Sequence, residues 1–268
     1  MTRFWEALDA GYRVILCDVW GVLHDGVRLY PGAAERLAGW RREGRKVILI
    51  TNAPRTTEVI ERQLVRIGLA GEAWDGIASS GEAGIAALLA LGRPVGVLGT
   101  AGDRAVLESR DVPIAADGDF TDLACSGLDA ARPRVEQYRE DLERWASRGV
   151  LFHCLNPDRV VIYGGDPVPC AGALADAYER LGGQVCWYGK PYPAIYRHAL
   201  HLAGDPPREA VLAVGDGLQT DMLGAALMGF DAVFVSGGIH RGGPFPEDFA
   251  ARHGLDGWRP IAVVDGLA

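Results

Sequence analysis

Short apolar runs, each long enough for one strand, alternate with helix-length amphipathic stretches along this chain of 268 residues. Residues 14–17 (Val-Ile-Leu-Cys) and 47–50 (Val-Ile-Leu-Ile) are two of these runs, and helical patterns begin at Pro31 and after Thr56. Strands of a parallel sheet are apolar along their whole length because helices cover both of their faces. The alternation therefore predicts an α/β fold with a mainly parallel sheet covered on both sides.

A second set of strands and helices interrupts this pattern. It begins near residues 94–98, and the first pattern resumes with the apolar run at residues 211–214. We therefore expect a core domain made of residues 1–92 and 187–268, with an inserted α/β domain at 93–186.

Composition excludes several classes of partner. The formal net charge is −8, and no basic stripe of the kind that binds nucleic acid is present. No segment approaches the ~20 apolar residues of a membrane span, and the N-terminus lacks the apolar core of a signal peptide. The five cysteines are scattered, with no C-x-x-C pair, which is typical of reduced thiols in a reducing compartment. We expect a cytoplasmic protein without membrane or nucleic-acid partners.

Two polar segments directly follow the first two apolar runs, where α/β sheets place their ligands. Asp18 ends the first run, and a carboxylate buried there is costly unless a charge or metal compensates it. The alternative is an aspartate that caps the following turn. Thr51 and Asn52 follow the second run, and their hydroxyl, amide and backbone N–H groups are suited to holding a phosphate. The alternative is an ordinary strand-to-helix turn.

Two more polar segments lie in the second half of the chain. Lys190 lies between a glycine and a proline. The alternative to a functional role is a solvent-exposed side chain, which is more usual for a lone lysine. Asp216 and Asp221 lie five residues apart after the run at 211–214. This spacing suits one metal ligand and one carboxylate that orients a neighbouring lysine.

Together the four segments resemble the four signature motifs of the haloacid dehalogenase (HAD) superfamily, in the same order and at the same kind of strand end. Residues 156–158 (Asn-Pro-Asp), 170–174 and 189–191 further resemble class IIA, which includes nitrophenyl-phosphatase-like and sugar- or nucleotide-phosphatase-like members. The resemblance runs from Tyr12 to about Ile239. It implies a doubly wound, Rossmann-like core whose insert is a class II cap.

The resemblance also implies a role for each matching residue. The carboxylate of Asp18 would attack phosphorus and form an aspartyl-phosphate. Mg²⁺ would be held by Asp18, the carbonyl oxygen of Trp20 and Asp216, and would offset repulsion between the nucleophile and the phosphate.

Relatives of this class often pair through their caps, so a homodimer is expected as well.

The phosphoryl oxygens of a small phosphorylated substrate would be held by Thr51, the N–H of Asn52 and Lys190. Asp221 would pair with Lys190 and fix its position. By this resemblance the catalytic residues are Asp18, Lys190 and Asp221.

One position departs from the family pattern. Phosphatases of this superfamily usually carry a second aspartate two residues after the nucleophile, where it protonates the leaving group and then activates water. This chain has Trp20 there, and an indole cannot replace an acid whose help is worth ~10²–10⁴-fold. His24 and Asp25 are the nearest residues in sequence that offer a substitute acid.

Three functions remain open on the sequence alone. The first is a phosphatase that uses another acid or none. The second is a metal-independent, dehalogenase-like hydrolase, because haloacid dehalogenases also carry an aromatic residue two after the nucleophile; they lack the Gly-Asp pair that this chain keeps at Asp216. The third is a non-catalytic protein that binds a phosphorylated metabolite. Retention of Asp18, Lys190, Asp216 and Asp221 favours chemistry.

Overall fold

The computed structural model describes residues 2–163, 166–238 and 243–268. The chain forms two compact units. The first comprises Met1–Thr51, Thr57–Ala78 and Lys190–Ala268, and the second comprises Asn52–Thr56 and Ser79–Gly189.

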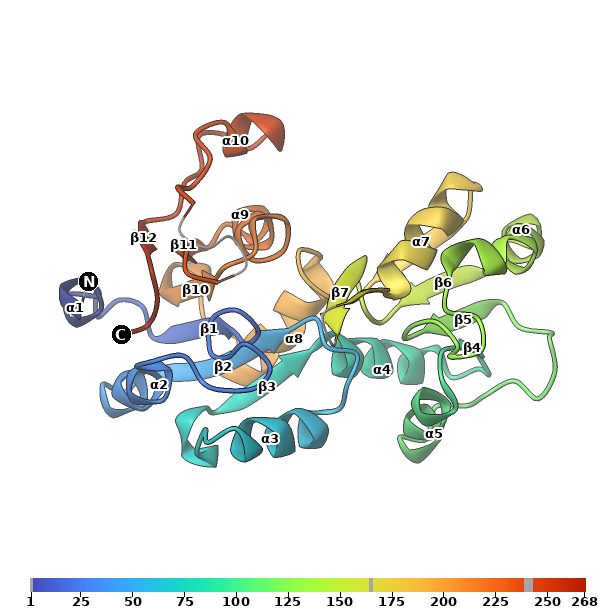
Figure 1. Ribbon diagram of the computed structural model, residues 1–268, viewed down its shortest axis with the longest axis horizontal. Coiled ribbons are helices and arrows are strands. Elements are labelled where there is room, and N and C mark those ends of the chain that lie inside the picture. The colour runs from blue at the N-terminus through green and yellow to red at the C-terminus, as the bar shows by residue number, and fades with distance from the viewer. Residues whose placement is uncertain (1, 164–165, 239–242) are drawn as a thin grey trace. The chain divides into compact units, whose positions relative to one another are not determined.

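A six-stranded sheet is the centre of the first unit, with the strand order β12-β11-β10-β1-β2-β3. Its strands are β1 (Val14–Asp18), β2 (Lys46–Thr51), β3 (Gly76–Ser79), β10 (Val211–Gly215), β11 (Asp231–Val235) and β12 (Ala262–Val264). The pairings from β12 through β2 are parallel. In Figure 1 the blue strands from the start of the chain join the orange and red ones from its end, so this sheet is assembled from both halves of the sequence.

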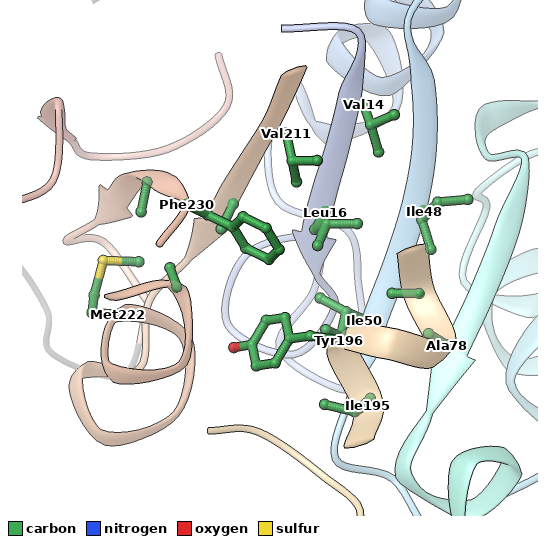
Figure 2. Close-up of a cluster of buried hydrophobic side chains, with 14 of the residues drawn as sticks. Val14, Leu16, Ile48, Ile50, Ala78, Ile195, Tyr196, Val211, Met222 and Phe230 are labelled. Atoms are coloured by element: carbon green, nitrogen blue, oxygen red, sulfur yellow. The ribbon is translucent and has the colours of Figure 1, made fainter. Parts of the chain in front are cut away.

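Helices cover this sheet. They are α1 (Thr2–Glu6), α2 (Ala33–Arg42), α3 (Thr57–Arg66), α8 (Pro193–Ala203), α9 (Leu223–Met228) and α10 (Phe249–Arg252), with the short turns η1 (Gly71–Ala73), η3 (Arg208–Ala210) and η4 (Leu218–Met222). Alternate residues of a strand face opposite sides of the sheet. Leu16 and Ile50 therefore share one face, where they pack with Tyr196 of α8 (Figure 2). All five residues of β1 are buried: the four apolar ones, as their continuous pattern predicts, and Asp18 with them.

The second unit has its own parallel sheet, with the order β4-β5-β6-β9. The strands are β4 (Gly96–Leu98), β5 (Asp122–Cys125), β6 (Leu151–Cys154) and β9 (Gln184–Trp187), and a separate antiparallel hairpin is formed by β7 (Val160–Tyr163) and β8 (Asp166–Pro169). The helices are α4 (Ser80–Leu91), α5 (Ala101–Ser109), α6 (Arg139–Ser147) and α7 (Ala171–Arg180), with the turn η2 (Val135–Tyr138). The predicted α/β architecture with an inserted α/β unit is confirmed.

The division between the units differs from the expected boundaries at 92/93 and 186/187. Helix α4, residues 187–189 and the short segment Asn52–Thr56 all belong to the second unit. Helix α4 belongs to the second unit because its apolar side chains are buried there. Ile85 and Leu88 pack in one cluster with Val95 and Leu107 of the insert. A helix joins the unit in which its apolar side chains are buried.

Among the described residues, no helix has the length and apolar character needed to cross a membrane. The five cysteines are all free, and four of them are buried, as their scattered positions suggested.

Candidate active site

Four buried, charged side chains meet in the first unit. Asp18, Lys190, Asp216 and Asp221 are between 1% and 5% exposed. Asp18 is the last residue of β1, Asp216 follows β10, Asp221 lies on η4, and Lys190 precedes α8. The parallel pairing of β1 with β10 brings the carboxyl ends of these strands to the same edge of the sheet. Lys190 is therefore not the solvent-exposed lysine that its isolated position in the sequence allowed.

Lys190 connects two of the carboxylates. Its Nζ lies 2.5 Å from Oδ1 of Asp18 and 2.7 Å from Oδ1 of Asp221. The contact with Asp221 is the one expected from the sequence. The contact with Asp18 was not foreseen, and it places the ammonium group directly beside the expected nucleophile.

The local backbone fixes the position of Asp221. The segment that carries it is a π-helical turn, in which the N–H of Met222 donates to the carbonyl of Gly217 at 3.0 Å. Oδ2 of Asp221 accepts a hydrogen bond from the N–H of Gly217, also at 3.0 Å. Such wide turns are frequent at functional sites because they redirect one side chain. Asp221 can therefore hold Lys190 through one oxygen while the other is tied to the backbone.

Glycines give Asp216 its place. Gly21 has φ +91, and a Cβ there would collide with the Asp216 carboxylate. A Cβ on Gly238 would collide with the same side chain. Two backbone segments can approach this carboxylate closely only because neither carries a side chain.

The electrostatics of the group follow from its burial. Burial raises the pKa of Asp18 well above its usual range, the charge of Asp221 adds to the rise, and Lys190 opposes it. Burial by itself would lower the pKa of Lys190, but the charges of Asp18 and Asp221 outweigh it, so the pKa is raised. Lys190 is therefore a permanent cation at neutral pH, and the carboxylates call for further positive charge.

The donor set fits a divalent metal ion. Asp18, Asp216 and Asp221 each offer a carboxylate oxygen, and these oxygens lie within 4.8 Å of one another. Lys190 supplies one positive charge to three carboxylates, so a divalent ion would balance the group. Carboxylate oxygens are the ligands that Mg²⁺ prefers. The ligands expected from the family resemblance were Asp18, Asp216 and the Trp20 carbonyl, and Asp221 was expected only to pair with Lys190. The structure places the Asp221 carboxylate in the same cluster.

The indole of Trp20 packs on its own loop. A Cβ on Gly26, whose φ is +94, would collide with the indole ring. His24 meets the indole edge-on, with ring centroids 5.3 Å apart. Trp20 nevertheless remains 49% exposed, so an aromatic surface is available close in sequence to Asp18.

His24 and Asp25, the suggested substitute acids, both lie in environments that lower their pKa. His24 is buried and its Nδ1 accepts a hydrogen bond from the N–H of Gly26 at 2.8 Å. Burial lowers the pKa of His24, and the nearby Asp25 offsets this only in part. Hydrogen bonds from the backbone N–H groups of Arg28 and Val27 hold the pKa of Asp25 below its usual range. Neither environment favours a proton donor at neutral pH.

The two expected phosphate-binding residues after β2 fall on opposite sides of the unit boundary. Thr51 is the last residue of β2 and is buried in the first unit. Asn52 belongs to the second unit, where its Nδ2 donates to Oδ1 of Asp158 at 2.8 Å. Sequence reasoning missed Asp158, although the Asn-Pro-Asp segment that contains it had been noted as part of the family resemblance.

Comparison with protein-family models gives two matches. Residues 15–113 match a model described as a haloacid dehalogenase-like hydrolase. Residues 187–268 match one described as HAD-hydrolase-like. The matched segments include Asp18, Thr51, Lys190 and Asp216, and therefore cover all four motifs.

Individual proteins are similar over most of their length. Ribonucleotide monophosphatase NagD of Escherichia coli (strain K12) is 30% identical over 234 residues, which cover 84% of this chain and 88% of the relative. Chronophin of Homo sapiens is 29% identical over 252 residues, covering 85% and 82%. The crystal structure of a haloacid dehalogenase-like hydrolase from Brucella suis 1330 superimposes with a TM-score of 0.83 at 34% identity, over 98% of both chains.

Proposed function

The chain belongs to the haloacid dehalogenase-like hydrolases, in class IIA, and from this membership we propose that it is a Mg²⁺-dependent phosphatase acting on a small phosphorylated metabolite. The observation that carries the proposal is the buried group in which Lys190 bridges Asp18 and Asp221 beside Asp216. A nucleophile, a cation for the phosphate and a set of metal ligands are thus present together.

Asp18 is the proposed nucleophile. One of its carboxylate oxygens forms a bond to phosphorus while the bond from phosphorus to the leaving-group oxygen breaks, giving an aspartyl-phosphate. Water then attacks phosphorus, which releases inorganic phosphate and restores the carboxylate. Covalent catalysis of this kind replaces one difficult displacement by two easier ones.

Lys190 neutralises charge on the phosphoryl oxygens, and Asp221 keeps its ammonium group in place. The pKa of Lys190 is raised by these neighbours, so the group stays charged throughout. Thr51 and the backbone N–H of Asn52 are proposed to donate to the remaining phosphoryl oxygens. Fixed donors need no reorganisation when charge develops in the transition state.

Mg²⁺ would be held by Asp18, the carbonyl of Trp20 and Asp216. When bound, it supplies positive charge that offsets the repulsion between an anionic nucleophile and an anionic phosphate. The buried carboxylates support this assignment, because they gather more negative charge than Lys190 balances.

The substrate range is proposed to favour good leaving groups. The usual acid is replaced by Trp20, and the environments of His24 and Asp25 lower the pKa of both groups. A leaving group that departs as a stable anion needs no proton.

The two alternatives remain testable. A metal-independent dehalogenase has no use for the buried Asp216, and the similar protein NagD is named a ribonucleotide monophosphatase. A non-catalytic binding protein has no need of a nucleophile held beside a lysine. Both arguments favour the phosphatase.

We propose a cytoplasmic location, supported by the five free cysteines. The net charge of −8 supports the absence of nucleic-acid partners. A homodimer is proposed on the family resemblance alone.

The deciding experiment measures phosphate release from nitrophenyl phosphate and a panel of phosphorylated metabolites, with Mg²⁺ and with a chelator, in parallel with halide release from haloacids. We expect phosphate release that requires Mg²⁺ and Asp18. Asp18→Asn, which keeps the shape but is neither charged nor nucleophilic, should abolish turnover while the protein stays folded. Halide release without metal would instead establish the dehalogenase, and ligand-induced thermal stabilisation without turnover would establish the binding protein.

A further inference from the structure

The segment Asn52–Thr56 follows a strand of the first unit but is built into the second. Three hydrogen bonds hold Asn52 and Arg55 there. Asn52 Nδ2 donates to Asp158 at 2.8 Å, Ser80 Oγ donates to the carbonyl of Asn52 at 2.7 Å, and Ser79 Oγ donates to the carbonyl of Arg55 at 2.6 Å. From this arrangement we infer that Asp158 is a positioning residue for phosphate binding, acting through the side chain of Asn52. The inference rests on the proposed function for the role of Asn52.

Asp158 is itself firmly placed. Its backbone N–H donates to Oδ1 of Asn156 at 3.2 Å, and its carbonyl accepts from the N–H of Gly172 at 3.1 Å. A Cβ on Gly172 would collide with the carbonyls of Pro157 and Asp158, so the start of α7 lies directly against this loop. Asn52 therefore meets an acceptor whose backbone is fixed on both sides.

A carboxylate at this position also decides which way the Asn52 amide faces. An ionised aspartate only accepts hydrogen bonds, so it can bind the NH₂ group of Asn52 and never its oxygen. The other end of the amide lies against Gly189, where a Cβ would meet Oδ1 of Asn52. The amide is thus oriented by Asp158 on one side and confined by Gly189 on the other.

The consequence concerns the backbone N–H of Asn52, the proposed phosphate donor. The side chain of Asn52 is held by Asp158 and its carbonyl by Ser80, so little freedom remains at the Cα between them. A donor that is already aimed loses less entropy when the phosphate binds. Asp158 acts on the phosphate through Asn52, without touching it.

A double-mutant cycle tests this inference. The dissociation constant for inorganic phosphate, measured by calorimetry in the presence of Mg²⁺, is compared for wild type, Asn52→Ala, Asp158→Ala and the double variant, alongside kcat and KM on nitrophenyl phosphate. Each single variant should weaken phosphate binding by about tenfold, the effect of one charge-assisted hydrogen bond. The double variant should be no weaker than either single one, because both remove the same contact.

Two further variants guard against a general structural effect. Asp158→Asn keeps the shape but offers an NH₂ group as well as an oxygen, so it should weaken binding less than Asp158→Ala. Asp141→Asn, which removes another half-buried, ion-paired carboxylate from the same unit, should leave phosphate affinity unchanged. Thermal unfolding of each variant identifies any that is not folded. If Asp158→Ala is not folded, Asp158→Asn takes its place in the cycle.

Additive losses in the cycle, or unchanged phosphate affinity in Asp158→Ala, would overturn the inference while leaving the phosphatase intact. A wild-type protein that binds phosphate but hydrolyses no ester would end the phosphatase proposal, and the four dissociation constants would still decide the role of Asp158. If wild type binds no phosphate at all, the positioning role is overturned too.

Discussion

The ammonium group of Lys190 lies 2.5 Å from a carboxylate oxygen of Asp18, and both side chains are more than nine-tenths buried. A buried pair at this distance is stable only when its remaining charges are also balanced. The same lysine reaches Asp221, and Asp216 completes the group. The proposed chemistry therefore depends on a few tightly coupled charges, and each can be tested separately.

Lys190 and Asp221 should behave as one functional element. Lys190→Ala removes the cation, and Asp221→Ala releases it. Because the two side chains touch at 2.7 Å, the double variant should cost little more in kcat/KM than Lys190→Ala alone. Asp205→Ala, an exposed acid beyond the end of α8, is the matched control and should have no effect. Strictly additive losses at the two positions would contradict the coupling.

Replacing Asp216 should mainly weaken the binding of Mg²⁺. Asp216→Asn keeps the size of a side chain that two glycines enclose, but it removes one negative charge from the group. The Mg²⁺ concentration needed for half-maximal phosphate release should rise, by about tenfold or more if one ligand charge is lost. A titration of activity against Mg²⁺ measures it. An unchanged midpoint would show that Asp216 is not a ligand.

Trp20 should determine how the rate depends on the leaving group. If the acid is what this chain lacks, Trp20→Asp should raise turnover on poor leaving groups far more than on nitrophenyl phosphate, by up to ~10²–10⁴-fold. Rates on a series of phosphate esters of graded leaving-group pKa measure this dependence. No gain on any ester would contradict the missing-acid explanation.

His24 and Asp25 are tested in the same series. Burial lowers the pKa of His24, and backbone hydrogen bonds lower that of Asp25, so His24→Ala and Asp25→Asn should leave the leaving-group dependence unchanged. A rate that collapses only on poor leaving groups in either variant would identify that residue as the acid.

The second unit should lose stability in acid through Asp122. Burial by itself would raise the pKa of this carboxyl, but hydrogen bonds from Arg93, His153 and Thr121 outweigh it and lower the pKa to about 2. The unfolded value is about 3.9, so the folded state favours the ionised form. Asp122 therefore stabilises the protein fully above about pH 4, and this contribution is lost as the pH falls toward 2.

Urea unfolding of wild type and Asp122→Asn between pH 7 and pH 2 measures the effect. At pH 7 the variant should be less stable by about 1.5–3 kcal/mol, the usual contribution of hydrogen bonds to a charged group. The difference in unfolding free energy between wild type and Asp122→Asn should become smaller as the pH drops below 4. Asp176→Asn, which breaks a surface pair with Arg159, should show little effect at any pH. A difference in unfolding free energy that stays constant with pH would contradict the low pKa of Asp122.

Much of the fold could be predicted because buried parallel strands leave a simple trace in sequence. The apolar runs at residues 14–17 and 47–50 fall within β1 and β2. The polar residues that follow these runs lie at one edge of the sheet. The contact of Lys190 with Asp221, 31 residues farther along the chain, was expected from the family resemblance.

Other features leave no periodic trace. The bond between Asn52 and Asp158 spans 106 residues and joins two irregular segments, so no spacing rule predicts it. The membership of α4 depends on which apolar surface buries Ile85 and Leu88, and a helical sequence pattern does not say which unit supplies that surface. The direction of the Trp20 indole depends on the absence of a Cβ at Gly26, a detail of packing that sequence patterns do not encode.

The chain passes between its two units at 51/52, 56/57, 78/79 and 189/190, and these crossings determine what can be transplanted between relatives. A chimaera cut at 93 and 186 would separate α4 from the insert that buries its apolar face, and would take Asp158 away from its own Asn52. A graft of residues 79–189 that also carries the donor's residues 52–56 keeps both sets of contacts together. The proposed phosphate donor Asn52 and the other four residues of its segment would then be inherited with the insert rather than with the strand that precedes them.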